Sequence, residues 1–157
     1  MAFKTVKWYG KEVKIEVDKG ALGAIKSACI MVQRDVKQSM KHVGGGREYP
    51  RPGGKIHKAS APGEPPVIDY QRLVGSISYN WKGSGTETGI GQGQKGEGDG
   101  VSQPDKDLTG YVGTNVEYAK SLELGNAERH LKPRPYLRPS LERNRNKIKD
   151  FFKDIIK

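Results

Sequence analysis

A glycine-rich stretch, Gly91-Gln92-Gly93-Gln94-Lys95-Gly96, has the G-x-G-x-x-G spacing of dinucleotide-binding loops. In those loops the glycines join a buried strand to a helix N-terminus, and the helix dipole meets the phosphates. Here no apolar strand precedes the motif, and Gly98, Gly100 and Pro104 follow where the helix should begin. This context favours a loop over a nucleotide site.

The three histidines and the single cysteine are the other candidate ligands. They are His42, His57, His130 and Cys29. Zinc sites use ligands at close, regular spacing such as C-x-x-C or H-x-x-x-H, which these residues lack. Cys29 also falls among apolar residues at helical spacing, where a small buried thiol is the ordinary interpretation. We therefore expect no metal and no other cofactor.

Catalysis needs a reactive group beside a base and an orienting partner. No serine lies in a G-x-S-x-G elbow. Asp99, Asp105 and Asp107 fall in a glycine-rich segment rather than on the rigid elements that would gather carboxylates around magnesium. The sequence therefore predicts a protein that is not an enzyme.

Positive charge is the strongest bias of composition, with a formal net charge of +10. Many of the basic residues crowd one region: Arg129, Lys132, Arg134, Arg138, Arg143, Arg145, Lys147 and Lys149. No known nucleic-acid module accompanies them, so any contact with nucleic acid should be to phosphates. Lysines around the polar face of a helix are usually only solvated, and both interpretations remain open.

Hydrophobic periodicity predicts the elements that position these residues. Alternation over Phe3–Tyr9 and Val13–Val17 predicts a β-hairpin, and Asp18 is expected to cap a following helix. From Ala21 to Val43 apolar residues recur every three or four positions, which predicts a helix stopped by Gly44-Gly45-Gly46.

The later elements are predicted to be shorter. They are a helical turn at 69–73, strands at 77–81 and 109–116, a short helix at 116–124 ending at Gly125, and a last helix starting near Pro139. Together they predict an α+β fold: a small, mostly antiparallel sheet packed by the long helix of the N-terminal half and by a C-terminal helix.

Length favours one domain, because 157 residues can bury a sizeable core. The apolar fraction is only 34%, with 21 glycines and 9 prolines. We therefore expect an extended arm at about 44–67 and a glycine-rich loop at about 83–107, both ordering against partners. A lone cysteine, and the lack of a signal peptide or a long apolar run, predict a protein of the reducing cytoplasm that does not contact membranes.

An ordered set of short motifs resembles the phage head–tail joining and tail-completion family. The pieces are Ala59-Ser60-Ala61-Pro62-Gly63-Glu64-Pro65-Pro66; Arg72-Leu73 with Ser76-Ile77; Val112-Gly113-Thr114-Asn115; Tyr118-Ala119 with Leu122-Glu123-Leu124-Gly125; and Arg134-Pro135-Tyr136-Leu137-Arg138-Pro139. Departures are Tyr70-Gln71 in place of Thr-Gly, Lys120 in place of proline, and a lengthened loop at 83–100.

The resemblance implies a minor structural protein of a long-tailed bacteriophage. Such proteins form a ring, here expected to have six or twelve copies, around the channel through which genomic DNA passes. The expected partners are neighbouring neck proteins: portal, adaptor, head-closure protein, tail terminator or tail tube. The protein would assemble in the bacterial cytoplasm and remain in the virion, in the neck or at the top of the tail.

Two interpretations of the last motifs remain open: a rigid corner within one subunit, or a contact between subunits. Tyr118 and Leu122 are four apart and share a helical face. Glu117 or Glu123 is expected to pair with Arg134 or Arg138, across the turn or across a subunit boundary. The candidate interface residues are Tyr118, Leu122, Glu123, Arg134, Tyr136 and Arg138. The candidate contacts to channel DNA or to an acidic partner are Arg143, Arg145, Lys147 and Lys149.

Overall fold

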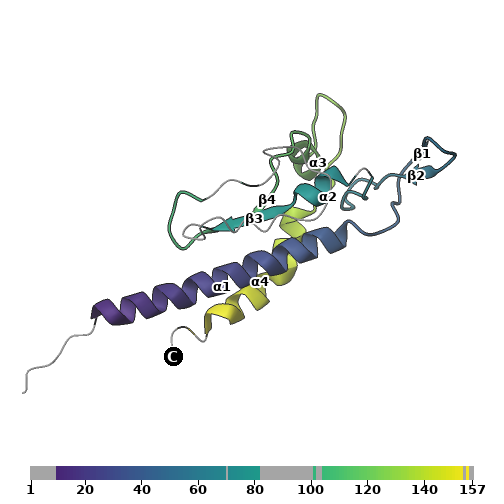
Figure 1. Ribbon diagram of the computed structural model, residues 1–157. Helices are drawn as coiled ribbons and strands as arrows, with labels where there is room; N and C mark the ends of the chain where they lie inside the picture. The colour runs from purple at the N-terminus through teal and green to yellow at the C-terminus, as the bar shows by residue number, and fades with distance from the viewer. Residues whose placement is uncertain (1–9, 70, 82–100, 102–103, 154, 156–157) are drawn as a thin grey trace, which may run out of the picture.

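The chain forms an α+β structure in which a long helix packs along a C-terminal helix (Figure 1). This computed structural model describes residues 10–69, 71–81, 101, 104–153 and 155, with side chains from Asp18 onward. Its elements are α1 (Gly10–Ser39), β1 (Glu48–Pro50), β2 (Ile56–Lys58), α2 (Arg72–Ser76), β3 (Ser78–Trp81), β4 (Gly110–Gly113), α3 (Ala119–Leu124) and α4 (Leu137–Lys153).

Helix α1 begins earlier than its sequence pattern predicts. Residues 13–17 belong to this helix, so the predicted strand there is wrong, and Asp18 lies inside the helix rather than capping it. Three alternating apolar residues are too few to fix a period, and positions 13 and 17 also continue the three–four spacing of α1. The first predicted strand, at 3–9, lies outside the described residues.

The apolar face of α1 is confirmed over the rest of its length. Its buried side chains are Ala24, Ile25, Cys29, Val32, Val36 and, just beyond the helix end, Met40. The helix ends at Ser39, four residues before the predicted end, and Val43 is 83% exposed. A Cβ atom on Gly44 would collide with the carbonyl group of Ala59, so this glycine permits a close backbone approach as well as ending the helix.

The predicted strands at 77–81 and 109–116 pair with each other. Strands β3 and β4 are antiparallel, with Ser78 opposite Gly113 and Trp81 opposite Gly110. The pair packs on α1, where Ile25 and Cys29 form a core cluster with Trp81. A neighbouring cluster contains Val32, Val36, Met40, Ile77 and Tyr136. The core therefore runs along one face of α1.

The predicted arm at 44–67 contains a short hairpin, β1–β2, in which Glu48 pairs with Lys58 and Pro50 with Ile56. Gly53 and Gly54 make its turn with φ values of 81° and 72°, a region that favours glycine. The chain then returns to the body, where the Ile68 amide donates to the carbonyl of Met40 at 3.3 Å. Most of the predicted loop at 83–107 lies outside the described residues.

The base of this hairpin is held by backbone contacts. The Gly46 amide donates to the Ala59 carbonyl at 2.8 Å. Glu64 Oε2 accepts hydrogen bonds from the amides of Gly45, at 2.9 Å, and Ala61, at 2.7 Å. These bonds hold the pKa of the Glu64 carboxyl below its ordinary value. The two strands of the arm therefore leave the body from a fixed point.

The later helices lie close to their predicted positions. Helix α2 starts three residues after the predicted start of the turn, and α3 ends at Gly125, whose φ is 79°. Helix α4 starts at Leu137, so Pro139 lies in its first turn, where proline lacks only an N–H that would have no partner in the helix. Among the described residues, none of the helices combines the length and apolar character needed to cross a bilayer.

We expect Gly110→Ala to lower the free energy of unfolding by about 1–3 kcal/mol, the usual cost of overpacking. A Cβ atom there would lie 2.5 Å from Cys29 Sγ and 2.8 Å from Ile25 Cγ2. Gly113→Ala in the same strand is the matched control, because its Cβ atom would meet only Val101 at 3.8 Å. Urea denaturation measures both, and equal effects would contradict the predicted close packing of β4 on α1.

Candidate functional site

The carboxylate of Glu123 caps the N-terminus of α4. Its Oε2 accepts hydrogen bonds from the amides of Tyr136, at 2.8 Å, and Leu137, at 3.0 Å. Its Oε1 accepts one from the Arg138 amide at 3.0 Å. The first amides of a helix lack partners within the helix, and the positive end of its dipole favours an anion. One side chain of α3 therefore fixes the start and direction of α4.

Tyr136 lies at the centre of this corner. It is fully buried in the cluster with Val36, Met40 and Ile77, and its hydroxyl lies 3.5 Å from the carbonyl oxygen of Ala119. Burial, with smaller effects of Glu123 and Tyr118, raises the pKa of its phenol, so the ring stays uncharged.

Arg134 links α3 to the segment that follows β2. Its Nε donates to the Ser60 carbonyl at 3.1 Å, and its own amide donates to the Leu122 carbonyl at 2.7 Å. Next to it, the Gly63 amide donates to the carbonyl of Pro133 at 2.9 Å. The segments at 60–63 and 133–134 are thereby joined by one side-chain bond, between residues 74 positions apart, and one backbone bond.

The predicted acid–arginine pairs are wrong within one chain. Glu123 bonds backbone amides rather than a guanidinium group, and Glu117 lies 3.9 Å from Arg72. The physical reason is the number of hydrogen bonds. Three amides at a helix start, which lack partners within the helix, hold a carboxylate in place more firmly than one mobile arginine side chain does. These residues thus form a corner within one chain, and a role of the same residues in subunit contacts stays a prediction.

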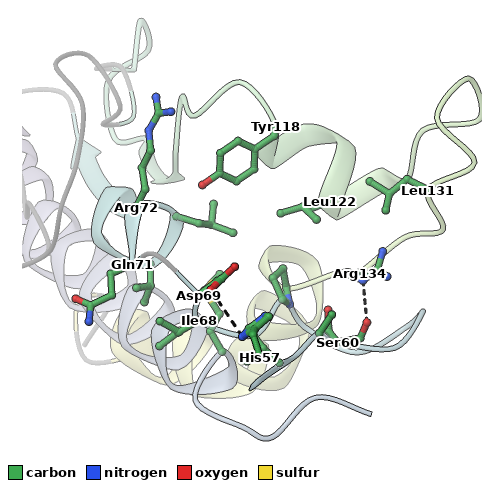
Figure 2. A pocket seen from close by; sticks show the side chains of 16 residues that line it. His57, Ser60, Ile68, Asp69, Gln71, Arg72, Tyr118, Leu122, Leu131 and Arg134 are labelled. Carbon is green, nitrogen blue, oxygen red and sulfur yellow. Dashed lines mark hydrogen bonds and ion pairs between the residues drawn. The ribbon is translucent and has the colours of Figure 1, made fainter. Parts of the chain in front are cut away.

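A pocket of about 440 Å³ opens beside the corner, between α2, α3 and the segments at 57–60 and 66–69. Figure 2 shows three predicted interface residues, Tyr118, Leu122 and Arg134, lining it opposite His57 and Asp69. The Asp69 carboxylate pairs with Arg51 and lies 3.7 Å from His57 Nδ1. The pocket therefore combines an apolar wall with a charged edge that is partly neutralised.

The possible metal ligands of the chain are its His, Cys, Asp and Glu side chains. Within the part of the chain that the structure describes, no group of three or more His, Cys, Asp or Glu side chains is placed to hold a metal ion. Cys29 is buried under β4, and burial raises the pKa of its thiol to about 11. Such a thiol stays protonated at neutral pH, and the thiol form is a poor nucleophile.

The predicted basic residues of α4 divide into two groups. Arg143 donates to Asp35 of α1 at 2.8 Å and to Ser140 Oγ at 2.9 Å, so it ties α4 to α1. Arg145 pairs with Glu142 at 3.6 Å along the helix. Lys147 and Lys149 are exposed and make no ion pair with any residue that the structure describes. These three outer residues are the ones available to a partner.

The sequence patterns missed an apolar groove of about 520 Å³ between α1, β4 and α4. Its walls include Ala28, Val112 and Leu141, and Tyr111 and Arg138 also line it. Leu141 is 50% exposed and Tyr111 is 43% exposed. Local patterns could place apolar residues on each helix but could not show this groove, because its walls come from α1, β4 and α4, which are distant in the chain.

Comparison with known proteins adds no family assignment: no protein-family model, curated protein or solved structure matches the chain. The resemblance to phage tail-completion proteins therefore stays a prediction from the ordered motifs of the sequence.

We expect Glu123→Ala to lower the free energy of unfolding by on the order of 2 kcal/mol, because it removes the acceptor for three amides. Glu117→Ala is the control, since its side chain is 84% exposed and its ion pair is long, and it should change stability by less than about 0.5 kcal/mol. Chemical denaturation compares them. An effect of Glu123→Ala as small as that of the control would refute the capping role.

Proposed function

We propose that this chain is a structural neck or tail-completion protein of a long-tailed bacteriophage, that it helps join the DNA-filled head to the tail, and that it is not an enzyme. The observation that carries the proposal is that the motifs shared with the family bond to one another. Motifs that occur in this order in the sequence and that contact one another in the fold support the resemblance better than isolated matches would.

Three contacts connect the motif pieces. Arg134 bonds the carbonyl of Ser60, which joins the last motif to the first. Ser76 Oγ lies 2.7 Å from Thr114 Oγ1, which joins the last residue of α2 to the residue after β4. Glu123 then caps the helix that follows Arg134-Pro135-Tyr136. This supports the family assignment because each motif supplies one side of a contact to another motif.

The exposed apolar side chains support a role in assembly. Val43 is 83% exposed, Ile56 69%, Leu124 62% and Leu141 50%. Contacts with neighbouring subunits would remove these apolar side chains from water, which favours association. We infer a ring of six or twelve copies that contacts portal, adaptor, head-closure, terminator or tube proteins in the neck or at the top of the tail.

The runner-up function is non-specific nucleic-acid binding by the basic C-terminal region. The observation that favours it is the exposure of Arg145, Lys147 and Lys149 on α4, where Arg145 and Lys149 are four apart and share a face. Within a neck the same face would meet genomic DNA in the channel. As an independent function it would give binding that ignores sequence and weakens steeply with salt, because counterions are released from each phosphate contacted.

Deletion of the gene from a phage that encodes this chain tests the proposal. We expect filled heads and finished tails to accumulate separately, and the wild-type chain supplied from a plasmid should restore joined, infectious particles. Electron microscopy of those particles should show the chain as a ring between head and tail. Joined particles without the chain would overturn the proposal, and salt-sensitive DNA binding in that case would favour the runner-up.

A further inference from the structure

The outer face of the β1–β2 hairpin presents an apolar pair beside a charged pair. Pro50 and Ile56 are cross-strand partners, as are Glu48 and Lys58, and alternation along the strands puts both pairs on one face. Ile56 is 69% exposed. The other face carries His57, whose Nδ1 lies 3.7 Å from Asp69 of the body, so the Pro50–Ile56 face is the one turned outward.

The groove between α1, β4 and α4 offers complementary chemistry. Its apolar wall includes Val112 and Leu141, and its one charged lining residue is Arg138. The Arg138 amide is bonded to Glu123, while its guanidinium group makes no ion pair with any residue in the described ranges. Glu48 is likewise exposed, and its carboxylate makes no ion pair within the same ranges.

The hairpin cannot fill the groove of its own chain. It follows the C-terminal end of α1, whereas the groove lies against the middle of that helix, around Ala28 (Figure 1). Ala28 and Met40 are separated by roughly 18 Å along the helix axis, from the rise per residue. The base of the hairpin is also fixed, because Gly44 and Gly46 contact the backbone of Ala59.

We propose that the outer face of the hairpin of one copy docks into the α1–β4–α4 groove of a second copy, with Ile56 against Leu141 and Glu48 facing Arg138. The two surfaces differ, so the contact is head-to-tail, and repetition closes a ring if the rotation allows it. The inference rests on the proposed function and deepens it by assigning the surfaces that hold the ring together.

A second copy fits better than other occupants. The groove lining that the structure describes is apolar with one cation, Arg138. The hairpin face carries an apolar pair with Glu48 and Lys58, and Lys58 is near enough to Glu64 to help lower the pKa of that carboxyl, which leaves Glu48 as the charge that can face Arg138. Nucleic acid would bring phosphates to a mainly apolar wall, which would leave the wall uncovered. The hairpin and the groove also occur once each per chain, so every copy can give one contact and receive one.

A charge-swap cycle tests the contact between Glu48 and Arg138. We expect Glu48→Arg and Arg138→Glu each to raise the concentration for half-assembly at least about 10-fold, as expected when a close charge pair becomes a repulsion. The double variant should return most of the way to wild type. Light scattering and native mass spectrometry over a concentration series measure assembly. Glu128→Arg, on an exposed carboxylate outside both surfaces, is the matched control and should have no effect.

Crosslinking tests the apolar half of the contact without a change of charge. Ile56→Cys combined with Leu141→Cys, treated with a short bifunctional maleimide, should give a ladder of covalent oligomers on a denaturing gel. Ile56→Cys with Leu124→Cys is the control, because Leu124 is 62% exposed but lies outside the groove. Cys29 is buried, and its raised pKa keeps it slow to react.

Several outcomes would overturn the docking proposal: a chain that stays monomeric at every concentration, a double charge variant no better than the single ones, or a ladder from the control pair. Single variants that block head–tail joining yet assemble normally would assign these surfaces to another neck protein.

Supplying the variants to the deletion phage separates the two proposals. If Glu48→Arg restores joined particles as wild type does, the docking contact is wrong and the neck role stands; if wild type restores nothing, the neck role is wrong.

Discussion

The hydrogen bonds from three amides of the α4 start to the Glu123 carboxylate are the constraint on which the rest of the structure depends. They set the direction in which the last helix leaves the small helix α3. Because that direction is set, Tyr136 enters the core beside Val36 and Met40, and Arg143 reaches Asp35 on α1. A polar contact at the corner thereby determines how the apolar faces of the two long helices meet.

This arrangement separates residues that maintain the corner from residues that can meet a partner. Tyr136 is buried and Arg134 bonds backbone carbonyls, so their described contacts serve the fold. Arg138 does both, since its amide belongs to the cap and its guanidinium lies on the groove. In Arg138 the backbone amide therefore stabilises the fold, while the side chain of the same residue faces the groove.

The sequence predicted the elements that periodicity controls. The spacing of Ile25, Cys29, Val32 and Val36 identified the buried face of α1, and Gly125 marked the end of α3. It failed at residues 13–17, where three alternating positions fit both a strand and a helix. It also missed the cap and the groove, because the partners of Glu123 lie 13 to 15 residues away and the groove walls come from three elements. Those features depend on packing, which a local pattern does not contain.

The closed base of the β1–β2 hairpin makes the length of the arm independent of the packing of the body. Gly44 lies against Ala59, Gly46 bonds it, and the Glu64 carboxylate holds Gly45, so the two ends of the arm are joined before the strands begin. Residues added to or removed from the Gly53–Gly54 turn would change how far the arm extends without disturbing the core. The length of the arm can therefore change separately from the fold of the body that carries it.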